Sequence, residues 1–352
     1  MNPLIDTPEA LSAILPGIAA HQRIALDTEA DSLHSYFEKL CLIQLSIPGQ
    51  NYLIDPLAGF SLQPLLDLLE KRELILHGAD YDLRLPRRIG FPRPATLFDT
   101  MIAARLVGRT EFSLAALINH HFNLQLTKAS QKANWGRRPL SPQMVEYAIN
   151  DTRFLLELAE YFEKQLKELN RWDWFQQSCE KAITAASITK ERDPETLWRV
   201  AGSNDLSDRG SAILRALWHW RDQEAQAADR PAFHILHNEQ LVRNAERLDR
   251  GLPPDVPHLR GGRRQRFDEA ARAALGLPAE EWPRVIRKPR LRPNPEQESR
   301  FRALREKRDS AAAALQLDPS LIAPKATLEK LASEPDQAPA VLMPWQMEAM
   351  KL

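Results

Sequence analysis

The stretch Arg23-Ile24-Ala25-Leu26-Asp27-Thr28-Glu29 indicates the fold class. Its apolar first half predicts a buried strand, and strand alternation places Asp27 and Glu29 on one side with Thr28 facing away. Two neighbouring carboxylates in an apolar strand repel each other and lose hydration, so they need a cationic partner. Arg23 is the only Lys or Arg in the stretch. We therefore favour a divalent metal, and the alternative is a strand end with two solvated acids.

A second acidic cluster follows another predicted strand. The apolar run Glu73-Leu74-Ile75-Leu76-His77 leads into Gly78-Ala79-Asp80-Tyr81-Asp82, where a helix over 80–90 is expected. Functional side chains gather where strands end, which makes Asp82 a candidate. Acids at a helix start can also simply favour the helix dipole. Leu97-Phe98-Asp99-Thr100 repeats the pattern, and there we expect Asp99 to be a helix N-cap.

The third cluster lies on a predicted helix that begins at Ser141 and Pro142. Ser is a favoured N-cap and Pro a favoured first helical residue. Tyr147 and Asp151 are four residues apart, so they lie on the same face of this helix. Taken alone, that spacing also fits an ordinary surface hydrogen bond.

Together the three clusters resemble the DEDD superfamily of 3′-to-5′ exonucleases, and most closely the ribonuclease D family. The motifs are Leu26-Asp27-Thr28-Glu29, then His77-Gly78-Ala79-Asp80-Tyr81-Asp82-Leu83, then Tyr147-Ala148-Ile149-Asn150-Asp151. Tyr in the third motif marks one subgroup. The resemblance runs from about residue 20 to the C-terminus. It implies an α/β ribonuclease H-like exonuclease domain, with a mixed sheet flanked by helices, followed by all-α helical-bundle domains.

The resemblance also implies a two-metal site for Mg²⁺ or Mn²⁺. Asp27 would be shared by both ions, Glu29 and Asp151 would complete the nucleophile-side site, and Asp82 would hold the leaving-group-side ion. Tyr147 would orient the attacking water.

Contact with nucleic acid is implied for Lys128, Trp135, Arg138 and His77. The alternatives are that Trp135 belongs to the core and that Arg138 is a solvated partner of another charge. Ala30 stands where the family usually has an aromatic residue, which is expected to wedge against the terminal base. The effect of Ala30 on selectivity for the terminal nucleotide is left open.

Four regions are expected along the chain: an exonuclease domain over 1–176, a helical linker over 177–203, a helicase-and-ribonuclease-D C-terminal (HRDC) domain over 204–284, and a second, divergent HRDC-like segment over 296–352. Two basic runs, 260–266 and 284–292, could stay solvated or contact a phosphate backbone.

The function expected from the resemblance is a 3′-5′ exoribonuclease that releases nucleoside 5′-monophosphates. Its substrate would be RNA, above all tRNA precursors trimmed at their 3′ ends. One alternative is a DNA 3′-5′ exonuclease, since some helicases and proofreading exonucleases share the motifs. The other is a catalytically inactive nucleic-acid-binding scaffold, although all four carboxylates are present.

Composition agrees with a two-part enzyme. The 352 residues have no formal net charge, yet residues 1–180 carry 18 Lys and Arg against 22 Asp and Glu, and residues 181–352 carry 29 against 25. The two cysteines, Cys41 and Cys179, offer neither a metal spacing nor a disulfide framework, and Cys41 is expected in the core. We find no secretory signal and no apolar run of membrane-spanning length, so a cytoplasmic protein is expected. No obligate protein partner is evident.

Overall fold

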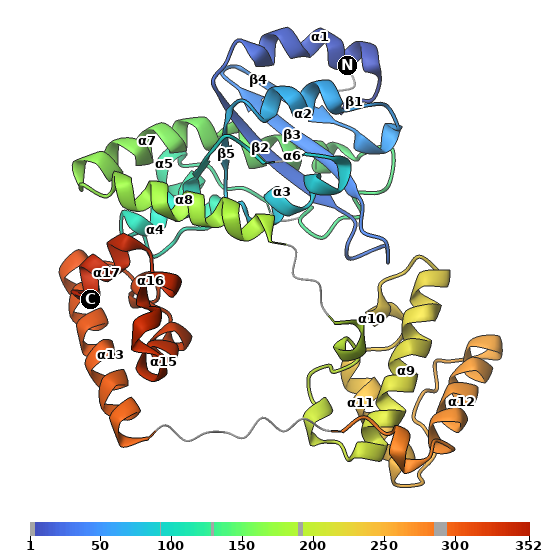
Figure 1. The fold of residues 1–352 in the computed structure, drawn as a ribbon. Coiled ribbons are helices and arrows are strands. Elements are labelled where there is room, and N and C mark those ends of the chain that lie inside the picture. Colours follow the sequence, from blue (N-terminus) through green and yellow to red (C-terminus); the bar gives the residue numbers. More distant parts are fainter. Residues whose placement is uncertain (1–3, 92, 128–129, 189–192, 285–293) are drawn as a thin grey trace. The chain divides into compact units, whose positions relative to one another are not determined.

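The computed structural model describes residues 4–91, 93–127, 130–188, 193–284 and 294–352 (Figure 1). The chain forms two compact units. The sheet unit comprises Met1–Ala30, Leu40–Thr189 and Leu291–Leu352, and the helical unit comprises Asp31–Lys39 and Lys190–Arg290.

The sheet unit is built on one six-stranded mixed sheet with the order β1-β4-β3-β2-β5-β6. Its strands are β1 (Leu4–Ile5), β2 (Arg23–Ala30), β3 (Leu40–Ile47), β4 (Gln50–Ile54), β5 (Glu73–Leu76) and β6 (Thr96–Asp99). β2, β3 and β4 pair antiparallel in turn, whereas β5 and β6 run parallel to β2. The mixed sheet flanked by helices confirms the predicted fold class.

The parallel pairing explains where polar side chains gather. Because β2 and β5 run in the same direction, their carboxyl ends meet at one edge of the sheet. β2 ends with Asp27 and Glu29, and the chain leaving β5 reaches Asp82 within one helical turn. A β-bulge between Glu29 and Ala30 shifts the register against β3 at the same edge.

Helices of the sheet unit cover the sheet and complete its core. Before residue 190 they are α1 (Pro8–Ala19), α2 (Gln63–Leu69), α3 (Asp80–Arg84), α4 (Thr100–Leu106), α5 (Leu114–Phe122), α6 (Pro142–Arg153), α7 (Leu155–Glu168) and α8 (Trp172–Ser187). α6 packs against β2, β3 and β4. It begins as predicted, because the hydroxyl of Ser141 accepts a hydrogen bond from the amide of Met144 and Pro142 opens the helix.

One helix is shorter than expected. The helix predicted over 80–90 ends at Arg84, and a 3₁₀ turn over Pro86–Ile89 follows. Proline has no amide hydrogen to continue the α-helical ladder. Asp82 therefore lies on a helix of little more than one turn.

The C-terminal helices belong to the core of the sheet unit. They are α13 (Pro295–Leu315), α14 (Pro319–Ile322), α15 (Lys325–Ser333), α16 (Ala338–Val341) and α17 (Pro344–Met350). The Trp345 ring stacks on Trp174 of α8, with centroids 5.0 Å apart. Arg171 Nη1 donates to the carbonyl of Leu106 and its Nη2 to that of Leu315, which ties α13 to the end of α4. These helices lie beside α4 and α8 (Figure 1).

The helical unit contains α9 (Asp208–Ala227), α10 (Ala232–Ile235), α11 (Asn238–Asp249) and α12 (Gly261–Leu275) around its own core. In the basic run 260–266, Arg263 and Arg266 both pair with Glu224, and Arg264 pairs with Asp268. Three of the four arginines in the run are thus paired within the unit, with two carboxylates between them. The second basic run, from residue 285 onward, lies outside the described residues.

Candidate active site

The structure brings together the four carboxylates that the sequence singled out. Asp27, Glu29, Asp82, Asp151 and the phenol of Tyr147 line one cavity of about 530 Å³. They come from β2, α3 and α6, which meet at the carboxyl edge of the sheet. Three of them form the tightest group, since oxygens of Asp27, Glu29 and Asp151 all lie within 4.8 Å of one another.

The pKa values of the four carboxylic acids are raised above their usual range. Burial, together with the charges of the other three, raises the pKa of Asp27 well above its usual range. Burial and the neighbouring Asp151 and Asp82 raise the pKa of Glu29 to about 9. Burial also raises the pKa of Asp151 to about 7. Such raised pKa values are expected for carboxylates that repel one another, with no cation among the described lining residues.

Asp82 is held by a residue that sequence analysis passed over. Thr28 donates twice to Asp82 Oδ1, from its amide at 3.0 Å and from its hydroxyl at 2.6 Å. Burial raises the pKa of Asp82 to about 6, and the two bonds from Thr28 work against that rise. Thr28, placed opposite Asp27 and Glu29 by strand alternation, therefore orients the one carboxylate outside the tight group.

Tyr147 lies beside Asp151, one helical turn further along α6, and its phenol partly offsets the rise in the pKa of Asp151. Burial and the charges of Asp151, Glu29 and Asp27 raise the pKa of Tyr147 above its usual range. The phenol is therefore protonated at neutral pH and can act as a hydrogen-bond donor toward Asp151. Its oxygen can still accept a hydrogen bond from a water molecule in the cavity.

The donor set suits a divalent cation. Hard cations such as Mg²⁺ and Mn²⁺ prefer carboxylate oxygens. Among the described residues that line the cavity there is no Lys or Arg. A cation bound here would relieve the repulsion that raises the carboxylate pKa values. The residues present thus fit the metal site implied by the motifs.

Two further residues support this edge of the sheet. The Asp99 carboxylate accepts hydrogen bonds from the amides of Gly78 and Ala79 and caps α4, as predicted. It thereby fixes the turn that leads to Asp82. His77 lines the cavity, its Nδ1 lies 2.9 Å from the hydroxyl of Thr100, and burial lowers its pKa.

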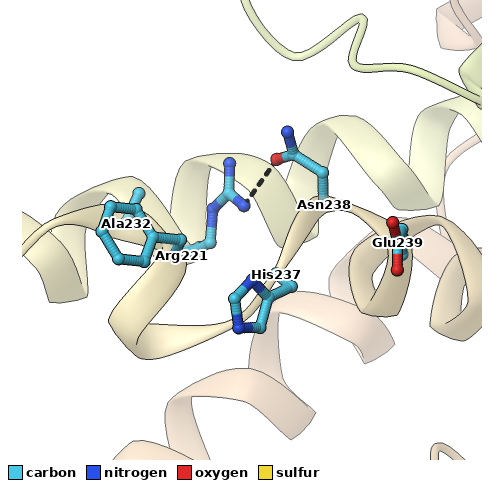
Figure 2. Close-up of a pocket in the computed structure, with 6 residues that line it drawn as sticks. Arg221, Ala232, His237, Asn238 and Glu239 are labelled. Carbon is cyan, nitrogen blue, oxygen red and sulfur yellow. Dashed lines mark hydrogen bonds between the residues drawn. The ribbon is translucent and has the colours of Figure 1, made fainter.

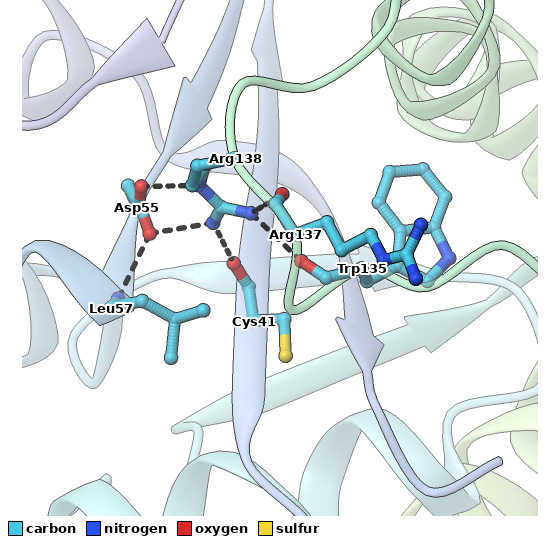
Figure 3. Close-up of polar contacts among 6 residues, drawn as sticks. All are labelled: Cys41, Asp55, Leu57, Trp135, Arg137 and Arg138. Carbon is cyan, nitrogen blue, oxygen red and sulfur yellow. Dashed lines mark hydrogen bonds and ion pairs between the residues drawn. The ribbon is translucent and has the colours of Figure 1, made fainter. Parts of the chain in front are cut away.

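Arg138, expected to contact nucleic acid, is fully engaged within the protein (Figure 3). Its Nε and Nη2 form a bidentate ion pair with the carboxylate of Asp55, both at 2.6 Å. Nη2 also donates to the carbonyl of Cys41, and Nη1 donates to the carbonyls of Trp135 and Arg137. A guanidinium has five N–H donors, and these five bonds use all of them. Arg138 thus anchors the segment before α6 and has no donor left for a phosphate.

The other expected nucleic-acid contacts differ in position. Trp135 is 1% exposed and packs in a small cluster with Cys41 and Ala148. Its ring lies 6.0 Å from that of Tyr147, so it supports the phenol and is inaccessible to a substrate base. Lys128 lies outside the described residues.

Comparisons with known proteins agree with this geometry. Residues 3–167 match the 3′-5′ exonuclease family model and residues 211–251 match the HRDC domain model. The chain is 33% identical to the ribonuclease D of Sphingobium indicum, covering 74% of this chain and 68% of that protein. It is 30% identical to the ribonuclease D of Gluconacetobacter diazotrophicus, covering 97% and 89%. The crystal structure of Escherichia coli RNase D has the same fold, with a TM-score of 0.72 at 23% identity, covering 99% and 96%.

Fold, acidic edge and family match define a 3′-5′ exonuclease, a hydrolase of phosphodiester bonds. Within that class, the chain belongs to the ribonuclease D family. Among the described residues, no helix is long and apolar enough to span a membrane.

Proposed function

We propose that the protein removes nucleotides one at a time from the 3′ ends of RNA, with tRNA precursors as its main substrates. The observation that carries this proposal is the single cavity shared by four carboxylates and Tyr147. Membership of the ribonuclease D family supports RNA over DNA, as does the helical unit that follows the exonuclease motifs. A cytoplasmic location goes with this role.

In the proposed site, Asp27, Glu29 and Asp151 would hold one divalent ion, while Asp82 and the shared Asp27 would hold a second. Bound ions would supply positive charge beside the attacking and the leaving oxygen of the scissile phosphodiester. Thr28 fixes the direction of the Asp82 carboxylate through two hydrogen bonds. Mg²⁺ and Mn²⁺ both suit these oxygen ligands.

Tyr147 then positions the water. Because its raised pKa keeps the phenol protonated, Tyr147 is a poor base at neutral pH. Its hydroxyl donates to Asp151, and its oxygen accepts a hydrogen bond from water aligned with the bond between phosphorus and O3′. Attack breaks that bond, releases a nucleoside 5′-monophosphate, and leaves a new 3′-hydroxyl on the shortened RNA.

His77 and Lys128 remain proposed RNA contacts, since His77 lines the cavity. Ala30 offers no ring against the terminal base, so we propose weak discrimination among terminal nucleotides.

A direct substrate comparison tests the function. Purified protein with Mg²⁺ or Mn²⁺ is offered a 3′-extended tRNA precursor and a single-stranded DNA of matched sequence. We expect the RNA to be trimmed to its mature end much faster than the DNA is shortened. Equal or faster hydrolysis of DNA would support the DNA exonuclease instead. If neither the RNA nor the DNA is hydrolysed, the result would support an inactive scaffold.

A further inference from the structure

A cavity of about 420 Å³ in the helical unit combines a buried cation with exposed rings (Figure 2). Its lining residues are Arg221 of α9, Ala232 and Phe233 of α10, and His237, Asn238 and Glu239 at the start of α11. All come from the helical unit, so the cavity is complete within it.

Arg221 is buried and forms no ion pair with a carboxylate among the described residues. Arg221 is only 5% exposed, and its Nε has no hydrogen-bond partner among the described residues. Nη1 donates to the carbonyl of Leu236 at 2.9 Å and to Asn238 Oδ1 at 2.8 Å. The nearby carboxylate of Glu224 is already paired with Arg263 and Arg266. Burial lowers the pKa of Arg221, and the charge of the neighbouring Asp222 carboxylate only partly offsets that lowering.

The backbone adds to this demand for negative charge. The twelve-residue helix α11 begins at Asn238, with His237 as its N-cap. Gln240 Oε1 already accepts a hydrogen bond from the His237 amide at this helix start. The dipole of the helix start still favours an anion, and the buried guanidinium lies at the same cavity. Glu239 opposes this effect, but it is exposed and lies beyond Asn238, away from Arg221 (Figure 2).

The rings beside the cation favour a planar group. Phe233 is 40% exposed, so part of its ring is accessible to a ligand. Its ring is stacked with that of His237 at 6.3 Å between centroids and 26° between planes. Exposed aromatic rings beside positive charge are typical of sites where successive bases of a single strand stack.

We propose that this cavity binds one nucleotide unit of single-stranded RNA, with its phosphate on Arg221 and the start of α11 and its base on Phe233 and His237. An anion alone would explain Arg221 but not the exposed ring pair, and an apolar ligand would leave the guanidinium uncompensated. This inference rests on the proposed RNA substrate. It adds a nucleotide-binding site distinct from the catalytic cavity.

The test measures binding separately from hydrolysis. Fluorescence anisotropy with a short labelled oligoadenylate RNA, in EDTA so that nothing is cleaved, compares full-length wild type with Phe233→Ala, His237→Ala and Arg221→Met. We expect Phe233→Ala to weaken binding about tenfold, since stacking contributes about 1–3 kcal/mol per base. Arg221→Met should reduce the salt slope by about 0.7, the amount for one single-strand phosphate.

Matched controls and a hydrolysis assay separate the alternatives. Leu252→Ala removes a comparably exposed apolar side chain, and Arg243→Met removes an exposed charge from α11, so both should bind as wild type does. The rate of dinucleotide hydrolysis should be the same in Phe233→Ala as in wild type. If the wild type hydrolyses no dinucleotide, the proposed function is overturned, but the binding comparison still stands. If thermal unfolding shows that Arg221→Met is not folded, the affinities of Phe233→Ala and His237→Ala alone test the nucleotide site. Wild-type affinity in both ring variants would overturn the nucleotide site, even if Arg221→Met binds more weakly.

Discussion

Asp27 faces three other acids in the catalytic cavity, and burial together with their charges raises its pKa well above the usual range. A carboxyl group whose pKa is raised by folding binds more protons in the folded state than in the unfolded one. By linkage, its contribution to stability is lost as pH rises from its ordinary pKa, about 4, through the raised value. For Asp82, Asp151 and Glu29 the raised values are about 6, 7 and 9.

The metal-free protein should therefore lose stability between about pH 5 and pH 9. Asp27→Asn removes one charge from the cluster and should raise the melting temperature in EDTA at pH 8, with a smaller gain at pH 5. Thermal unfolding of both proteins across this range measures the effect. The same difference at every pH, or a less stable variant, would contradict the electrostatic account.

The hydroxyl of Thr28 orients the carboxylate of Asp82. Thr28→Val keeps the shape but removes the 2.6 Å donor to Asp82, so the pKa of Asp82 should rise further. Residues that orient a metal ligand typically affect metal affinity 10–100-fold, and we expect about a tenfold loss in Mn²⁺ affinity by calorimetry. Thr28→Ser keeps the donor and serves as the control. Equal Mn²⁺ affinity in the Val and Ser variants would leave Thr28 without this role.

At the scale of elements, the segment before α6 depends on Arg138. Removing one partner of a buried ion pair costs about 3–5 kcal/mol, and the Arg138 side chain is 25% exposed, so we expect the lower end of that range for Arg138→Gln. The melting temperature should fall while the salt slope of RNA binding stays as in wild type. Arg137→Gln removes an exposed neighbouring charge as a control. A slope shallower by about 0.7, with unchanged stability, would restore Arg138 as a phosphate contact.

What the sequence could predict follows from the range of each interaction. Local sequence patterns and motifs were enough to predict the strand ends, the N-caps Ser141 and Asp99, and the four carboxylates. Thr28 was missed because its partner is 54 residues away. Arg138 was interpreted as a substrate contact because three of its acceptors are backbone carbonyls, which leave no trace in a sequence.

At the scale of the molecule, the end of the chain bears on the stability of the catalytic unit. An HRDC-like character for 296–352 remains a prediction, but these helices share one hydrophobic core with the exonuclease elements. Amphipathic helices reveal which face is buried but not what covers it, so this packing was not readable from sequence. A truncation before residue 291 would expose the Trp174 face of α8.

Trp345→Ala tests this packing without deleting a helix. Trp345 is 1% exposed and stacks on Trp174, so its loss should destabilise the protein by about 3–5 kcal/mol. Leu352→Ala, which truncates an exposed side chain at the C-terminus, is the control. Chemical denaturation should show the loss in the same transition that reports on the sheet unit. An unchanged midpoint would mean that the C-terminal helices add nothing to that unit's stability.

The central claim is that four carboxylates and Tyr147 act as one metal-dependent centre on RNA 3′ ends. Its most direct test is the hydrolysis of a 5′-labelled RNA by wild type and by five variants: Asp27→Asn, Glu29→Gln, Asp82→Asn, Asp151→Asn and Tyr147→Phe. Each variant must first show the wild-type melting profile, measured in EDTA at low pH, as evidence that it is folded. We predict a ladder shortened one nucleotide at a time with Mg²⁺ or Mn²⁺ and none in EDTA. The carboxylate variants should keep less than a tenth of the activity, and Tyr147→Phe should be slower by about 10²–10⁴. Immediate release of the 5′ label, or full activity in any carboxylate variant, would contradict the account.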